Sequence, residues 1–315
     1  MKIGYPCINR TLGCAGAKTF RLKSYSLERL DETVRSNLSC LEAMLQFNVK
    51  HGTLFFRITS DLVPFASHPE AQPPWSDRYV DEFERIGSFI RENEIRIDMH
   101  PGQYTLLNAK EPRIVTNAIR DLQYHCDVLD LMELDETAKV QIHVGGVYGD
   151  REASMQRFVD AVGGLPRSLR RRLVIENDER SYPLPDCLGV SAQTGCPVVL
   201  DVYHHSLLNH GESLSEALAA AAMTWKAADG LPIVDYSSPL PRGRFGRHAD
   251  TLDPEDFGRF LKDSLPNDFD VMLEIKDKEV SALRAVALAQ SDPRFALSAI
   301  NPSPRPPKRS QSTRC

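Results

Sequence analysis

The feature that most constrains this chain is a regular alternation of short β-branched, apolar runs with longer amphipathic segments. Eight runs are predicted to be strands, at 2–5, 53–57, 96–99, 140–144, 173–176, 198–201, 232–235 and 270–275. Segments with helical periodicity lie between them, at 27–47, 77–91, 112–132, 151–162, 213–226, 254–265 and 279–290. Strands that alternate with helices indicate parallel pairing, and eight of them can close into a barrel.

We therefore predict an α/β protein with a (β/α)8 TIM-barrel fold. The 315 residues suit one such barrel, because these barrels typically occupy ~250 residues and tolerate insertions. A doubly wound open sheet is the main rival. However, none of the predicted strands is followed by GxGxxG, GxxxxGKS or GxxxxGKT. The sequence therefore predicts no nucleotide cofactor.

Two segments interrupt the alternation. Residues 59–76 are polar and rich in proline, and we expect a long loop over one mouth of the barrel. The end of the chain is basic, rich in proline and without periodicity, which is typical of disorder. We predict a single domain over 1–300 and a disordered tail over 301–315.

Charge and targeting signals limit the classes of partner. The chain has 38 Lys and Arg against 43 Asp and Glu, a formal net charge of −5. That balance argues mildly against a nucleic-acid partner unless many carboxylates bind metal ions. The N-terminal MKIGYPCINR is interpreted as a strand rather than a signal peptide, and no apolar run reaches the ~20 residues of a membrane span. We expect a soluble cytoplasmic protein with no membrane partner.

The cysteines give no sign of a disulfide framework or a structural zinc site. There are seven of them, an odd number, and no two are spaced as CxxC. Reduced thiols are therefore the default expectation for a cytoplasmic chain.

Ionisable residues end most of the predicted strands or lie just after them. They are His100, His143, Glu176, Asp201, His204, His205, Asp235, His248, Asp250 and Glu274. The carboxyl ends of all strands in a barrel meet at one mouth, where active sites are built. A single histidine in such a place is more often structural than a ligand, and an acidic residue there often caps the next helix. Capping explains neither the histidines nor Glu274 within the apolar start of VMLEIKDKE.

These residues together predict a site for several metal ions. Carboxylates gathered in one place repel one another unless cations neutralise them. Mixed histidine and carboxylate ligands suit zinc, manganese or iron. We expect two or three divalent ions per chain and favour Mn²⁺, with Zn²⁺ or Mg²⁺ as alternatives. Two ions placed close together favour phosphoester hydrolysis.

The ordered set of motifs resembles the UV damage endonucleases. The matching segments are GYPCINRTLGC, RITSDLVPFASHP, DMHPGQYTLLN, QIHVGGVYGDR, IENDER, LDVYHH and VMLEIKDKE, from near the N-terminus to about residue 280. The family is similar in fold to endonuclease IV and the xylose-isomerase-like barrels. The resemblance implies a DNA-repair enzyme that nicks duplex DNA immediately 5′ of cyclobutane pyrimidine dimers and 6-4 photoproducts, without ATP.

The resemblance also implies roles for individual residues. His100, His143, Glu176, Asp201, His204, His248 and Glu274 fall on the family's metal-ligand positions. We expect Glu176, Glu274, His143 and Lys276 to act in catalysis. The role of Lys276 would be a phosphate contact, and the alternative is a solvated residue at the start of a helix. Gln103 and Tyr104 fall where the family inserts a polar and an aromatic residue at the lesion, and Tyr5 and Asn9 match positions near it. Without the resemblance, the PGQY segment would be interpreted as an ordinary turn.

Two positions depart from the family pattern. Where the family has K-x-H-Y-S on the seventh strand, this chain has Ile233-Val234-Asp235-Tyr236-Ser237. The family's lysine is a carboxylated ligand that bridges metal ions, and Ile233 has no ligand atom. Asp235 replaces the histidine and still has oxygen ligands. These departures concern the number of ions more than the fold.

Two other functions stay open at this stage. A sugar isomerase or epimerase on the same barrel would also bind metal ions through Glu, Asp and His. A lesion-binding protein that cannot cut would retain Gln103 and Tyr104 while lacking a complete metal site. In the favoured interpretation the partner is double-stranded DNA with UV lesions and the protein is a monomer.

Overall fold

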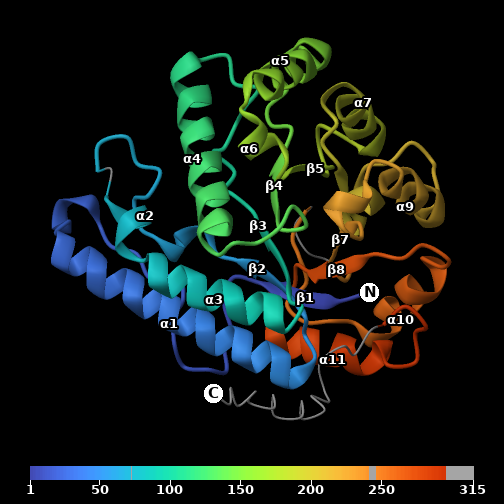
Figure 1. The fold of residues 1–315 in the computed structure, drawn as a ribbon. Helices are drawn as coiled ribbons and strands as arrows, with labels where there is room; N and C mark the ends of the chain where they lie inside the picture. Colours follow the sequence, from blue (N-terminus) through green and yellow to red (C-terminus); the bar gives the residue numbers. More distant parts are fainter. Residues whose placement is uncertain (72, 241–245, 296–315) are drawn as a thin grey trace, which may run out of the picture.

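The chain folds into a closed barrel of eight parallel strands (Figure 1), as predicted. The computed structural model describes residues 1–71, 73–240 and 246–295, so the predicted tail at 301–315 lies outside the described residues. The strands are β1 (Ile3–Pro6), β2 (Phe55–Ile58), β3 (Arg96–Met99), β4 (Lys139–His143), β5 (Leu173–Glu176), β6 (Val198–Asp201), β7 (Ile233–Tyr236) and β8 (Asp270–Leu273). They pair in sequence order, and β8 pairs with β1 to close the barrel.

Helices surround the barrel (Figure 1). They are α1 (Leu27–His51), α2 (Trp75–Arg78), α3 (Val80–Glu92), α4 (Pro112–Leu131), α5 (Arg151–Gly164), α6 (Arg167–Arg170), α7 (Leu184–Thr194), α8 (Val202–Leu207), α9 (Leu214–Ala222), α10 (Pro254–Asp263) and α11 (Glu279–Ala289). Three 3-10 turns are η1 (Leu22–Ser24), η2 (Ser60–Leu62) and η3 (Ala227–Asp229). No helix in the part of the chain that the structure describes is both long and apolar enough to cross a membrane.

The structure corrects several helix predictions. The segment predicted as one helix over 77–91 is divided at Tyr79 into α2 and α3, and the predicted loop at 59–76 contains η2 and the start of α2. Helices α6, α7 and α8 were not predicted. The sequence of α7, LPDCLGVSAQT, has a weak apolar period, and its helical form depends on packing against β5, β6, α5 and α9.

Local chemistry explains where the first helix starts and stops. The Ser26 side chain accepts a hydrogen bond from the Arg29 amide at the start of α1, and Gly52 ends the helix in the left-handed region at φ 73°. Gly4 has a different role. A Cβ atom there would lie 1.9 Å from the carbonyl oxygen of Phe55, so the close pairing of β1 with β2 requires glycine.

The barrel interior consists of an apolar layer and a polar layer. The apolar layer is a cluster separate from the main core, made by Phe55, Val174, Val199, Ile233 and Met272. Because side chains alternate along a strand, the residue two positions further faces the same way. Those residues are Arg57, Glu176, Asp201, Asp235 and Glu274. The polar layer therefore lies directly above the apolar one, towards the carboxyl ends of the strands.

The prediction that all cysteines are reduced is wrong for one pair. Cys14 and Cys40 form a disulfide, although 26 positions separate them in the sequence. Such a pairing leaves no spacing signal, because it depends on the fold bringing the two Cα atoms to 5.8 Å. Cys7, Cys126, Cys187 and Cys196 are free.

Candidate metal centre

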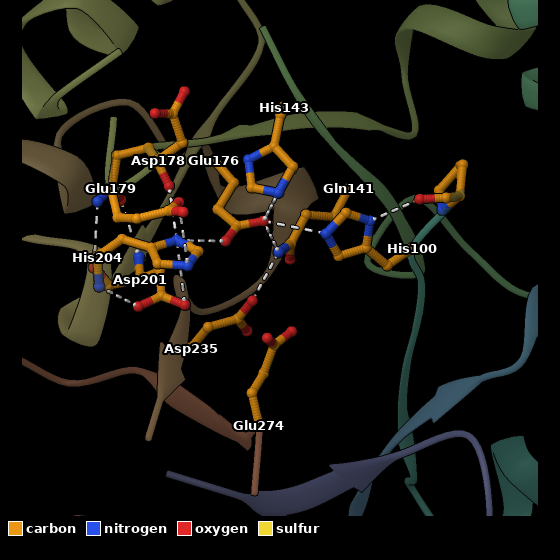
Figure 2. A network of polar contacts seen from close by, with 12 residues as sticks. His100, Gln141, His143, Glu176, Asp178, Glu179, Asp201, His204, Asp235 and Glu274 are labelled. Carbon is orange, nitrogen blue, oxygen red and sulfur yellow. Dashed lines mark hydrogen bonds and ion pairs between the residues drawn. The ribbon is translucent and has the colours of Figure 1, made fainter. Parts of the chain in front are cut away.

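Glu176, the last residue of β5, lies at the centre of the polar layer (Figure 2). Its Oε2 atom is 3.1 Å from Nε2 of His100 and 3.4 Å from Nε2 of His143. Its Oε1 atom is 3.2 Å from Nδ1 of His204. Burial by itself raises the pKa of Glu176, but His143 and His100 hold it well below its usual value. One ionised, buried carboxylate is therefore shared by three imidazoles, from the residue after β3, from β4 and from α8.

Asp201 ends β6, and its two oxygens face His204 in different ways: Oδ2 lies 3.5 Å from Nδ1 of His204. Its Oδ1 atom accepts the His204 amide hydrogen bond that caps α8, while Oδ2 has no hydrogen-bond partner among the described residues. Burial raises the pKa of Asp201 to about 7, against a lowering by His204. Burial lowers the pKa of His204, but Asp201 and Glu176 raise it to about 11. The pKa values of Asp201 and His204 are both raised, which indicates that a positive charge at this place stabilises the fold.

Among the described residues, three groups of side chains have ligand atoms close enough together to bind a metal ion. Within each group the atoms lie within 4.8 Å of one another: His100, His143 and Glu176; Glu176, Asp201 and His204; Asp201, Asp235 and Glu274. Neighbouring groups share Glu176 or Asp201. The structure therefore brings together most of the residues that the strand-end pattern singled out.

The donor chemistry of these groups fits divalent ions. Nitrogen and carboxylate oxygen ligands are those that Mn²⁺ and Zn²⁺ prefer, and all are present here without cysteine. His100 donates through Nδ1 to the carbonyl of Pro101 at 3.0 Å, so its Nε2, 3.1 Å from Oε2 of Glu176, is the nitrogen that could bind a metal ion. A backbone acceptor of this kind is the usual support of a metal-binding histidine.

His248 and Glu274 lie at the edge of the centre. Their Nε2 and Oε2 atoms are 3.5 Å apart, and Glu274 follows the last residue of β8. Burial lowers the pKa of His248, so this imidazole stays neutral at physiological pH and is able to bind a metal ion.

Arg57 is a central residue that the sequence analysis missed. It belongs to β2, is 2% exposed, and forms ion pairs with Asp98, Asp235 and Glu274. Although burial lowers the pKa of Arg57, Asp235 and Asp98 raise it well above its usual value. Its position in the apolar run LFFRIT, two residues after Phe55, was the available signal.

The sequence analysis also missed Gln141 and Asp98, which, like Arg57, are polar residues within predicted strands. Gln141 in β4 donates to Oε2 of Glu176 at 2.7 Å and to Oδ2 of Asp235 at 2.6 Å, so its amide joins two carboxylates (Figure 2). Asp98 in β3 accepts from two nitrogens of Arg57, at 2.9 and 2.8 Å. A polar residue inside an apolar strand carries a cost unless the fold supplies its partners.

Gln103 and Tyr104 lie in the loop after β3, beside the centre. An open cavity of about 440 Å³ is lined by Gln103 together with His100, His143, His248 and Glu274. The Tyr104 side chain is 80% exposed. A large exposed aromatic residue next to a polar cavity is typical of a binding surface.

Tyr5 and Asn9 lie below the surface. Their side chains are buried, the Tyr5 hydroxyl donates to Oδ1 of Asn48 at 2.7 Å, and Asn9 donates to the Tyr5 hydroxyl at 3.0 Å. In this structure both residues support the first strand, so a direct contact with a lesion stays a prediction.

Lys276, by contrast, reaches the wall of the cavity. Its side chain is partly exposed, and its Nζ atom lies 2.8 Å from Oδ1 of Asp250.

A second cavity, of about 510 Å³, lies at the opposite end of the barrel. Its lining includes Met1, Glu94, Arg96 and Asp270, which belong to the amino-terminal ends of strands and the preceding turns. In barrel enzymes that end of the fold serves stability, whereas chemistry occurs at the carboxyl ends. We therefore assign function to the smaller cavity beside Glu176.

The fold is a closed (β/α)8 barrel, and histidines and buried carboxylates meet at its strand ends. These two features define a class of barrel proteins that are suited to bind divalent ions. Within that class, the chain belongs to the UV-endonuclease UvdE family, whose model matches residues 1–297. The family inferred from the sequence motifs is thus confirmed.

Relatives and solved structures agree with this assignment. The UV DNA damage endonuclease of Clostridium perfringens (strain 13 / Type A) is 35% identical over 288 residues, covering 91% of this chain and 70% of the relative. The crystal structure of SacUVDE matches with a TM-score of 0.88 and 45% identity, covering 92% of this chain and 98% of the other. Endonuclease IV from Thermus thermophilus matches with a TM-score of 0.53 and 18% identity, covering 79% and 93%, which shows a shared fold.

Proposed function

We propose that this chain is a DNA-repair endonuclease that nicks duplex DNA immediately 5′ of cyclobutane pyrimidine dimers and 6-4 photoproducts. The reaction is metal-dependent hydrolysis of a phosphodiester, without ATP. The observation that carries the proposal is the shared carboxylate of Glu176, placed between three imidazoles beside an open cavity. We further propose that the protein acts as a cytoplasmic monomer that associates with the nucleoid.

The proposed cofactor is Mn²⁺, with Zn²⁺ or Mg²⁺ as alternatives. The ligands are His100, His143, Glu176, Asp201 and His204, with Asp235, His248 and Glu274 as further candidates. When bound, such ions supply acidification of water and neutralisation of phosphate charge. Glu176 keeps the imidazoles oriented, and Lys276 on the cavity wall contacts a phosphate oxygen.

Lesion recognition is assigned to Gln103 and Tyr104. A damaged, poorly stacked dinucleotide costs less free energy to extrude from the helix than a sound one. An aromatic side chain inserted into the duplex fills the resulting gap. The exposure of Tyr104, at 80%, leaves its ring free for this role. A metal-dependent sugar isomerase has no need of an exposed aromatic residue there, which favours the endonuclease over that alternative.

A lesion-binding protein that cannot cut is the second candidate. It is favoured by Ile233, which is fully buried in the apolar layer and offers no ligand atom. It would bind damaged duplex selectively and leave both strands intact at every concentration of Mn²⁺.

A nicking assay tests these proposals. The substrate is a duplex oligonucleotide with one cyclobutane dimer, incubated with Mn²⁺ or with EDTA, next to an undamaged duplex. We expect one cut 5′ of the dimer that EDTA abolishes.

Glu176→Gln should abolish the cut and retain binding to damaged DNA, because the proposed role of Glu176 is metal binding. Glu152→Gln, on the exposed face of α5, is the matched control and should cut normally. Full activity of Glu176→Gln would refute the site assignment.

A further inference from the structure

Arg57 lies in the polar layer next to two of the potential metal ligands, Asp235 and Glu274. Its Nη2 atom lies 3.0 and 3.1 Å from the two carboxylate oxygens of Asp235, and its Nη1 atom contacts Glu274. These two carboxylates, with Asp201, form the third group of potential ligands. A guanidinium cation is thus already bound to two of the three residues of that group.

The oxygens of Asp235 have their partners within the protein. Both face Arg57, and Oδ2 also accepts a hydrogen bond from Gln141 at 2.6 Å. Asp201 differs, because its Oδ2 has no hydrogen-bond partner among the described residues. In the third group, Asp235 and Glu274 are therefore already paired with a cation, and only Asp201, which the second group shares, keeps an oxygen without a hydrogen-bond partner.

The layer beneath Asp235 adds no further ligand. Ile233 precedes Asp235 by two positions on the same face of β7 and packs with Phe55, Val174 and Met272 in the apolar layer. An ion next to Asp235 could not gain a ligand from that side.

We propose that Arg57 takes the place of one metal ion, with Asp235 as its permanent counter-ion, so that the centre binds two divalent ions, both on Glu176. The inference rests on the proposed metal-dependent function and specifies its ion number. The first ion uses the group with His100 and His143, and the second uses the group with Asp201 and His204.

The charges of the described residues agree with this assignment. Five carboxylates lie in the polar layer or pair with Arg57 beside it: Asp98, Glu176, Asp201, Asp235 and Glu274. When all five are ionised, the one positive charge of Arg57 and the four of two divalent ions equal their negative charge. A guanidinium is charged at every physiological pH, so its contribution is fixed. A third divalent ion would add two uncompensated positive charges and would lie against the guanidinium, which repels it.

The test is the number of Mn²⁺ ions bound per chain, measured by elemental analysis after equilibrium dialysis. We expect two ions for the wild type and two for Asp235→Asn, which keeps the shape of the side chain and removes its charge. We expect three for Arg57→Met and two for Arg57→Lys, because the latter retains a cation. Arg96→Met, which removes a buried arginine that pairs with Asp270 at the other end of the barrel, is the matched control and should bind two.

Each outcome separates the inference from the proposed function. Three ions in the wild type, or the loss of one ion in Asp235→Asn, would overturn the role of Arg57 while leaving metal-dependent cleavage intact. A folded Arg57→Met protein that binds no additional ion would also overturn it. If Arg57→Met does not fold, the numbers of ions bound by the wild type and by Asp235→Asn still test the inference. No bound Mn²⁺ in the wild type would refute the proposed function itself.

Discussion

Replacing Arg57 by methionine should lower the stability of the metal-free protein far more than the loss of an ordinary ion pair. Arg57 is 2% exposed and pairs with Asp98, Asp235 and Glu274, so its removal leaves three carboxylates without their cation. Removing one partner of a buried ion pair costs ~3–5 kcal/mol. In a chain of this length each kcal/mol lowers Tm by roughly 2–3 °C, so the expected loss in EDTA is about 6–15 °C.

The expected loss depends on pH with a definite sign. Burial raises the pKa of both Asp98 and Asp235, and Arg57 opposes that rise in each case. Without Arg57 both pKa values move further above their unfolded values. A carboxyl group with a raised pKa in the folded state destabilises the fold as pH rises above the unfolded value, which is near 4. The difference in Tm between wild type and variant should therefore be largest at neutral pH and should shrink as pH falls towards 4.

The measurement is thermal unfolding of the wild type and of Arg57→Met, in EDTA and in Mn²⁺, between pH 4 and pH 7.5. Arg85→Met is the matched control, since Arg85 pairs with Glu42 at the surface and its side chain is 55% exposed. An exposed pair contributes less than ~1 kcal/mol. Mn²⁺ should raise the Tm of Arg57→Met more than that of the wild type, because an additional ion at 100 times its Kd adds ~2.7 kcal/mol. A loss no larger than that of Arg85→Met, or an equal response to Mn²⁺, would refute the reasoning.

Three further outcomes are expected. Tyr104→Ala should reduce the ratio of affinities for damaged and undamaged duplex, measured by fluorescence anisotropy, because it removes the exposed ring; an unchanged ratio would exclude the wedge role. The double variant Ile233→Lys with Asp235→His should lose incision activity, since it buries an ammonium group in the apolar layer and removes the counter-ion of Arg57; a gain would show that these two residues are defects. Dialysis against EDTA should abolish nicking and lower Tm, and added Mn²⁺ should restore both; activity that survives EDTA would argue against a metal-dependent reaction.

The barrel and most of its candidate ligands could be predicted from the amino-acid sequence alone. Strand prediction succeeded because a β-branched run such as 198–201 carries its preference locally, and all eight strands appear within two residues of their predicted bounds. Parallel strands in a barrel end at one mouth whatever the details of packing. The convergence of His100, His143, Glu176 and Asp201 therefore followed from their positions in the chain.

The balance of charges inside the barrel could not be predicted in this way, because it depends on contacts between distant strands. Arg57, Asp98, Gln141 and Asp235 come from four strands, β2, β3, β4 and β7, and no spacing in the sequence indicates that they meet. The same applies to the disulfide between Cys14 and Cys40 and to the burial of Tyr5. The alternation of side chains along a strand predicts which face of the strand a residue occupies. Which partner neutralises a buried charge depends on closure of the barrel, since closure brings side chains from distant strands within hydrogen-bonding distance.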